Sequence, residues 1–163
     1  MKKETYANNL SYIFNAERYG AKYSIDGGNK WMNHGDYCEC LAKSVLGFEP
    51  KKDANTRSDK DHDIREINAS VKSWKCGISD RKDLKAIGNR EEFLYQFFHD
   101  EIPNTTYIWV NDYDEFVDLY YMNMDEFKKF VDVCASWDNY EQKIRFTKSI
   151  NTIISYLEKE LDK

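Results

Sequence analysis

Two apolar runs typical of β-strands constrain the fold of this chain more than any other feature. Residues 107–110 and 116–122 are rich in the aromatic and β-branched side chains that favour strands. A polar turn at residues 111–114 separates the two runs. Because a short turn can join only antiparallel strands, we expect the runs to pair in that manner.

Helical patterns lie on both sides of this strand pair. Apolar side chains recur with a period near 3.6 residues in several segments. This periodicity predicts helices at residues 5–19, 30–46, 125–134 and 149–161. In addition, Asn89 followed by Glu91 and Glu92 predicts the start of a helix that ends before Pro103.

A hairpin is predicted from residues 62–67 and 70–76, which alternate in the period-2 manner of strands. The intervening Asn68-Ala69 is short enough for a two-residue turn. In that register one face of the hairpin carries five side chains: Asp63, Arg65, Ser70, Lys72 and Trp74. Glu66 then points to the opposite face, and a slip of one residue would reverse the assignment.

The order of these elements indicates the fold class. Strands occupy the middle of the chain, with a further short strand at residues 143–146, and helices lie at both ends. We therefore expect an α/β (α+β-like) fold with a central mixed or antiparallel sheet flanked by helices. The 163 residues correspond to a single domain, 1–163. A helix and turn at residues 1–29 would precede a core at residues 30–161.

The net charge of −5 hides an uneven distribution along the chain. Residues 1–50 are neutral overall, residues 51–90 carry 11 basic and 7 acidic side chains, and residues 91–163 carry 7 basic and 16 acidic ones. An acidic chain argues against indiscriminate nucleic-acid binding, whereas the basic middle segment permits a local polyanion site. The plain alternative is that both signs lie on solvated faces.

Location and thiol chemistry follow from what the sequence lacks. No apolar run approaches the roughly 18–20 residues that span a bilayer, and the first residues lack the apolar core of a signal peptide. We therefore expect no membrane partner and a cytoplasmic location. Disulfides are not expected there. The cysteines include no CxxC pair, so buried or partly buried thiols are favoured over a zinc site at His34, Cys38 and Cys40.

Asp63 and Lys72 become diagonal neighbours in the predicted hairpin. A carboxylate there can hold a divalent cation, which polarises a phosphodiester and lowers the pKa of a bound water. The lysine ammonium can position that water or offset the charge that develops on phosphate. The plain alternative is a surface ion pair that contributes little, with Asp63 closing the preceding polar loop.

This pattern resembles the PD-(D/E)xK nuclease superfamily, whose core is a helix bearing a glutamate, a strand bearing an aspartate, and a following strand bearing (D/E)-x-K. Residues 35–39 look like the helix signature, which ends at Glu39. His62-Asp63 stands at the Pro-Asp position. Ser70-Val71-Lys72 stands at the (D/E)-x-K position. The similarity in the order of elements covers residues 30–161.

The resemblance implies a restriction endonuclease-like core and a metal-dependent DNA endonuclease, of the kind found in phage, plasmid or restriction systems. It implies that Glu39 and Asp63 bind Mg²⁺ or Mn²⁺ and that Lys72 assists hydrolysis. Residues that would contact the DNA phosphates or lie near the site are Lys75, Arg81, Lys82, Lys85 and Gln96.

Two departures from the family pattern leave other functions open. His62 replaces the proline, and Ser70 replaces an acidic residue, which removes one metal-binding carboxylate. Two residues could replace that ligand: Glu66, which the predicted register places on the opposite face, or Glu39 from the helix. Ser70 therefore supports an alternative in which the fold binds DNA as an inactive or regulatory subunit. A third alternative is a protein-interaction module, as a homodimer or with a partner protein, because tyrosines are abundant.

Overall fold

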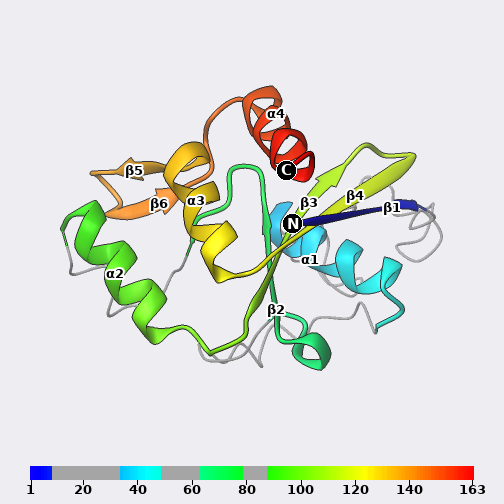
Figure 1. Cartoon of the computed structure of the whole chain (residues 1–163), viewed down its shortest axis with the longest axis horizontal. Coiled ribbons are helices and arrows are strands. Elements are labelled where there is room, and N and C mark those ends of the chain that lie inside the picture. Colours follow the sequence, from blue (N-terminus) through cyan, green and yellow to red (C-terminus); the bar gives the residue numbers. More distant parts are fainter. Residues whose placement is uncertain (9–33, 49–62, 79–87) are drawn as a thin grey trace, which may run out of the picture.

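A computed structural model describes residues 1–8, 34–48, 63–78 and 88–163 (Figure 1). The elements in chain order are β1 (Lys2–Ala7), α1 (His34–Val45), the 3₁₀ helix η2 (Arg65–Ile67), β2 (Ala69–Ser73), α2 (Arg90–Asp100), β3 (Thr106–Asp112), β4 (Phe116–Met122), α3 (Met124–Cys134), β5 (Ser136–Asp138), β6 (Lys143–Arg145) and α4 (Ile150–Leu161).

Four strands form a mixed sheet in the order β1-β4-β3-β2. The β4 strand pairs antiparallel with both β1 and β3, whereas β2 and β3 are parallel. Parallel neighbours need a crossover connection, and α2 lies on the segment that joins them. The predicted fold class, a mixed sheet flanked by helices, is confirmed, as are the two antiparallel strands at its centre.

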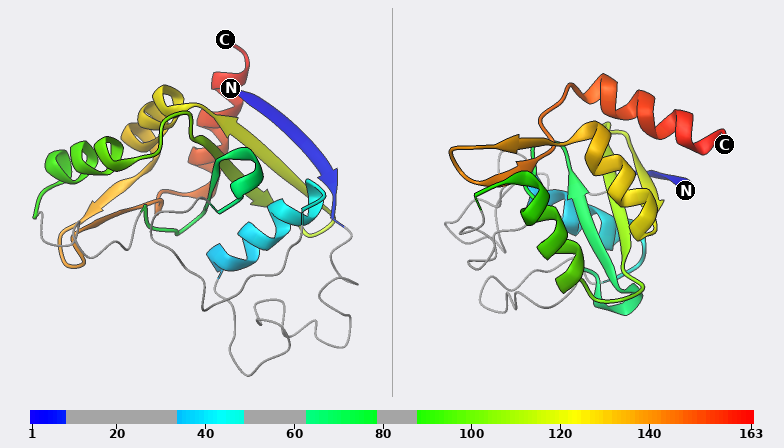
Figure 2. Two further views of the ribbon diagram at one scale, coloured as in Figure 1. Left: turned by 90° about the horizontal axis from the view of Figure 1, so that it is seen from below. Right: turned by 60° about the vertical axis from the view of Figure 1, so that its left-hand side comes forward.

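Helices cover both faces of the sheet, and the alternation of side chains along the central strands explains why (Figure 2). Tyr107 and Trp109 of β3 point to the face that carries α3 and α4. Ile108 and Val110 point to the face that carries α1. Both faces are therefore apolar, and each requires its own helical cover.

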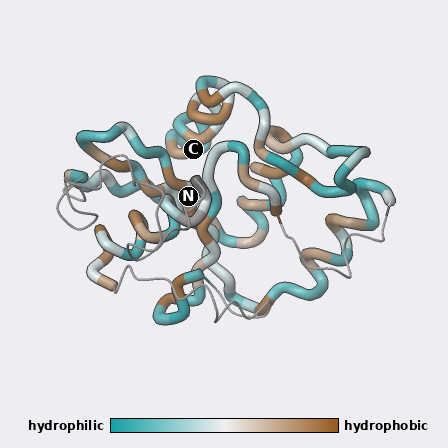
Figure 3. The backbone as a smooth tube through the Cα atoms, turned by 180° about the vertical axis from the view of Figure 1, so that it is seen from behind, coloured by the Kyte–Doolittle hydropathy of each residue, from teal (hydrophilic) through white to brown (hydrophobic). Residues whose placement is uncertain are grey.

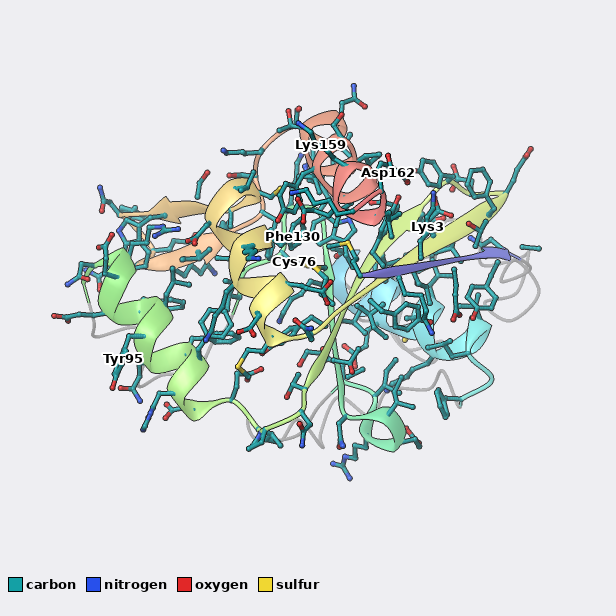
Figure 4. All side chains as sticks on the ribbon, viewed as in Figure 1. Lys3, Cys76, Tyr95, Phe130, Lys159 and Asp162 are labelled. Atoms are coloured by element: carbon teal, nitrogen blue, oxygen red, sulfur yellow. The ribbon has the colours of Figure 1, made fainter. Side chains whose placement is uncertain are left out.

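Aromatic rings fill the core on the α3 and α4 side. The ring of Tyr107 stacks on Phe127 with centroids 3.9 Å apart. Phe130, labelled in Figure 4, contacts Trp109 edge-to-face and stacks on Phe146, each at 5.1 Å. Rings of this size bury much apolar surface and also gain from their mutual geometry. This core therefore holds β3, α3 and the segment after β6 together.

Local sequence signals explain the ends and buried faces of the helices. The Asn89 side chain accepts a hydrogen bond from the Glu92 amide and begins α2, as predicted. Asn123 and Glu126 form a reciprocal capping box that begins α3. The four buried residues of α3 are the predicted ones: Phe127, Phe130, Val131 and Cys134. Hydrophobic and hydrophilic stretches alternate around α4 (Figure 3), as its amphipathic pattern predicts.

The prediction of a helix at residues 5–19 is wrong where the structure describes those residues. Thr5, Tyr6 and Ala7 belong to β1, which pairs with β4 along its whole length. Residues 9–19, the turn at 26–29 and the first residues of the helix predicted at 30–46 lie outside the described residues. Within residues 5–7, pairing with a distant strand outweighs the local helical pattern.

The predicted two-residue hairpin is also wrong. Ile64 and Ala69 form an isolated antiparallel bridge, so four residues rather than two close the turn. Three of those four residues form η2, and the fourth, Asn68, adopts a left-handed conformation with φ of 49°. The true partner of β2 is β3, because a period-2 pattern does not encode which strand pairs with it.

Two short strands, β5 and β6, form a separate two-stranded sheet. The predicted strand at residues 143–146 corresponds to β6, whereas β5 was not predicted. None of the described helices is long and apolar enough to cross a membrane.

Candidate functional site

Asp63 lies at the outer edge of β2, where the chain enters the sheet. Its Oδ2 atom accepts a hydrogen bond of 2.7 Å from the Val71 amide. The Val71 amide lies on the side of β2 that faces away from β3, so Asp63 satisfies a backbone donor that the sheet leaves free. The Ile64–Ala69 bridge lies on the same side of β2. This hydrogen bond fixes the position of the Asp63 side chain and engages one of its two carboxylate oxygens.

Lys72 points to the face that carries α3 and α4. In the parallel register it lies beside Trp109, whose side chain belongs to the core on that face. The Lys72 ammonium donates a hydrogen bond of 3.2 Å to the carbonyl oxygen of Ile78. The lysine therefore reaches along the sheet toward the turn that follows β2.

Glu39 lies on the other side of the sheet. It is a buried residue of α1 and forms an ion pair with Lys43 at 3.8 Å. Because α1 packs on the face that carries Ile108 and Val71, the sheet backbone separates Glu39 from Lys72. The structure therefore does not bring the predicted glutamate and the predicted lysine together.

The remaining predicted site residues are dispersed. Glu66 is exposed on η2, and Ser70 shares the face of Lys72. Gln96 donates a hydrogen bond of 2.8 Å to Asp100 within α2. Arg81, Lys82 and Lys85 lie outside the described residues. In the part of the chain that is described, no group of three or more His, Cys, Asp or Glu side chains is placed to hold a metal ion.

Trp74, Lys75 and Lys148 form a basic and aromatic surface at the end of β2, which we call the Trp74 patch. The Lys75 ammonium lies 4.4 Å from the centroid of the Trp74 ring. The indole Nε1 donates a hydrogen bond of 2.9 Å to the carbonyl oxygen of Lys148. A backbone hydrogen bond of 2.9 Å from Lys75 to Phe146 holds the two segments together. Both lysines are exposed, so their charges face solvent.

The charges of the Trp74 patch have no carboxylate partners within the described ranges. Elsewhere, Lys2, Lys3, Lys43, Arg90, Lys143, Arg145 and Lys163 each form ion pairs with acidic side chains. Lys75 is one of the residues that the sequence predicts as phosphate contacts, and Lys148 is not. No signal in the sequence links residues so far apart, because only the fold brings Lys148 to Trp74.

Compared with known proteins, the chain matches no family model, no curated protein and no solved structure.

A cluster of polar side chains from β1, β4 and α4 lies on the face of the sheet that carries α3 and α4. Lys3 forms ion pairs with Glu158 at 2.7 Å and with Asp118 at 3.5 Å. Tyr120 donates a hydrogen bond of 2.5 Å to Glu158, and Thr5 donates one of 2.5 Å to Asp118. Burial first, and then Glu158, raises the pKa of the Tyr120 phenol, which keeps it a hydrogen-bond donor. This cluster joins structural elements through mutually satisfied partners.

Proposed function

We propose that the chain binds DNA through the Trp74 patch. The observation that carries this proposal is the exposed Lys75 ammonium over the Trp74 ring, without an acidic partner among the described residues. Exposed Lys148 joins it through its backbone carbonyl, which accepts the indole hydrogen bond. Unpaired cations bind phosphates at the least cost, because no ion pair has to be broken. Aromatic rings interleaved with basic side chains are typical of nucleic-acid surfaces.

The proposal is tested with fluorescently labelled duplex DNA and anisotropy titrations over a range of salt concentrations. Each neutralised phosphate adds about 0.9 to the slope of log K against log salt. Lys75→Ala and Lys148→Ala are therefore expected to weaken binding and to lower the slope by about 1 each. Single-stranded DNA and RNA of the same sequence establish the preferred form of nucleic acid.

Lys159→Ala is the matched control for this experiment. Lys159 is an exposed lysine on α4. In Figure 4 its label lies away from that of Cys76, which directly follows Lys75 in the chain. This variant is expected to retain both the affinity and the salt slope of the wild-type protein. Equal losses in Lys159→Ala and Lys75→Ala, or salt-independent binding, would contradict the proposal.

A second candidate function is metal-dependent hydrolysis of the bound DNA, and Asp63 favours it. Its Oδ2 atom holds the Val71 amide, while Oδ1 makes no hydrogen bond with the described residues. Mg²⁺ commonly binds through one or two protein carboxylates, with water and substrate phosphates completing the coordination. Asp63 and a DNA phosphate supply ligands of this kind. Lys72 directly follows Val71, the residue whose amide positions Asp63.

Asp63→Asn tests the catalytic candidate with little change in shape. The amide oxygen can still accept the Val71 hydrogen bond, but the charge that attracts a cation is lost. With Mg²⁺ or Mn²⁺, wild-type protein is expected to nick supercoiled plasmid, and Asp63→Asn and Lys72→Ala to nick it at least about 100-fold more slowly. DNA affinity should remain unchanged in Asp63→Asn. Equal inactivity of all three proteins would leave DNA binding standing and exclude catalysis.

A further inference from the structure

A groove of about 420 Å³ runs between α2 and α3. Its lining residues are Leu94, Tyr95, Phe98 and His99 from α2, and Lys128 and Asp132 from α3. The volume is within the range of sites for small organic ligands. The lining shares no residue with the Trp74 patch, and Tyr95 lies well apart from Cys76, the neighbour of Lys75, in Figure 4.

Tyr95 supplies an exposed planar surface at the groove. Its ring stacks on His99 with the two ring planes 8° apart and the centroids separated by 5.9 Å. Nevertheless, 71% of Tyr95 remains exposed, so most of its ring is available for a further contact. The contact with His99 restrains the ring on one side, which reduces the ordering that a stacking ligand has to impose. The groove is therefore suited to a flat aromatic ligand.

Lys128 gives the groove a positive charge. Its ammonium lies 5.1 Å from the centroid of the Phe98 ring and has no carboxylate partner in the described part of the chain. Asp132, the acidic residue of the lining, is paired with Arg90 at 2.7 Å. Since that ion pair offsets the Asp132 charge, the groove has a net attraction for an anion.

We propose that this groove binds a nucleotide, with the base stacked on Tyr95 and the phosphate held by Lys128. The base and the phosphate of a nucleotide match the two features of the groove. An aromatic ring alone would form no ion pair with Lys128, and an inorganic anion would not stack on Tyr95. The same chemistry is offered by a free mononucleotide and by one unit of a single strand. This proposal does not depend on DNA binding at the Trp74 patch.

The test is calorimetric titration of the full chain with dAMP, adenosine and inorganic phosphate. We expect dAMP to bind at least tenfold more tightly than either fragment. Tyr95→Ala and Lys128→Ala should each weaken dAMP binding about tenfold, since the loss of one base stack or one charge contact is of that order. Tyr95→Phe retains the ring and should bind as the wild type does.

Two controls keep the result specific to the groove. Tyr140→Ala removes a tyrosine that is 96% exposed on the β5–β6 turn, and Lys129→Ala removes an exposed lysine next to Lys128 in α3. Both should leave dAMP affinity unchanged. The proposal is overturned if dAMP binds no better than adenosine and phosphate, or if these controls lose as much affinity as Tyr95→Ala.

Further measurements identify the source of the nucleotide and separate this site from the Trp74 patch. A single-stranded oligonucleotide that competes with dAMP, and that also depends on Tyr95, supports a strand as the ligand. A strand that does not compete supports a free nucleotide. Lys75→Ala should leave dAMP binding intact. If it abolishes dAMP binding, the ligand lies at the Trp74 patch and the groove proposal is wrong.

Discussion

Burial separates Cys76 from the other three cysteines. Cys38, Cys40 and Cys134 are buried, and burial raises the pKa of the Cys134 thiol to about 11. Thiolates, not thiols, react with alkylating reagents. Cys76 is partly exposed, and its sulfur lies 2.9 Å from the Ser73 hydroxyl in the turn that carries Trp74. Cys76 is therefore the cysteine most accessible to reagents, and it lies next to Lys75 of the Trp74 patch in the chain.

Alkylation of the native protein with iodoacetamide at pH 8 should label Cys76 at least about tenfold faster than Cys134. Peptide mass spectrometry identifies the labelled positions, and labelling in urea shows that all four thiols are intrinsically reactive. Cys76→Ser should leave the native protein almost unlabelled. Labelling of Cys134 at the rate of Cys76 in native buffer would mean that the described core opens readily.

Elements whose boundaries are set by nearby residues could be predicted from the sequence. The range of β4 and the buried face of α3 agree with expectation, because alternation, capping residues and apolar spacing all act within a few residues. β1 could not be predicted in the same way. Its sequence is mostly polar, and only β4, far along the chain, makes it a strand.

The candidate site shows the same division between local and distant information. The prediction for Asp63 and Lys72 depended on a hairpin register, and the structure replaces that hairpin by a four-residue turn and a parallel neighbour. Glu39 was assigned from a helix signature alone, which does not specify the face of the sheet that the helix covers. The contact between Trp74 and Lys148 depends on the packing of the whole second half of the chain.

At the scale of the whole molecule, Lys3 links the first strand to the last helix. Its ion pairs with Asp118 and Glu158 join β1, β4 and α4. Figure 4 labels Lys3 on β1 and Asp162 directly after the end of α4. Hydrogen bonds from Lys3 first, and then from Tyr120, lower the pKa of the Glu158 carboxyl below its ordinary value of 4.5. A carboxyl whose pKa is lowered on folding stabilises the folded state above the unfolded pKa.

Glu158→Gln should therefore lower the free energy of unfolding at pH 7 by no more than about 1 kcal/mol, because Glu158 is half exposed and solvent screens its ion pair. The difference from wild type should shrink as the pH falls below 4.5 and the folded-state carboxyl takes up its proton. Urea denaturation at a series of pH values measures this. Glu115→Gln, in the exposed β3–β4 turn, should show no such trend.

The pairing of β1 with β4 has a consequence for the time course of folding. Ala7 pairs with Phe116 and Lys2 with Tyr121, so this edge of the sheet closes across more than 100 residues. During synthesis β1 leaves the ribosome long before its partner exists, whereas β3 and β4 emerge together and can join at once. Closing so long a loop is entropically costly and slows the formation of distant pairs. In a growing chain, residues 2–7 thus have no partner strand until β4 has been made.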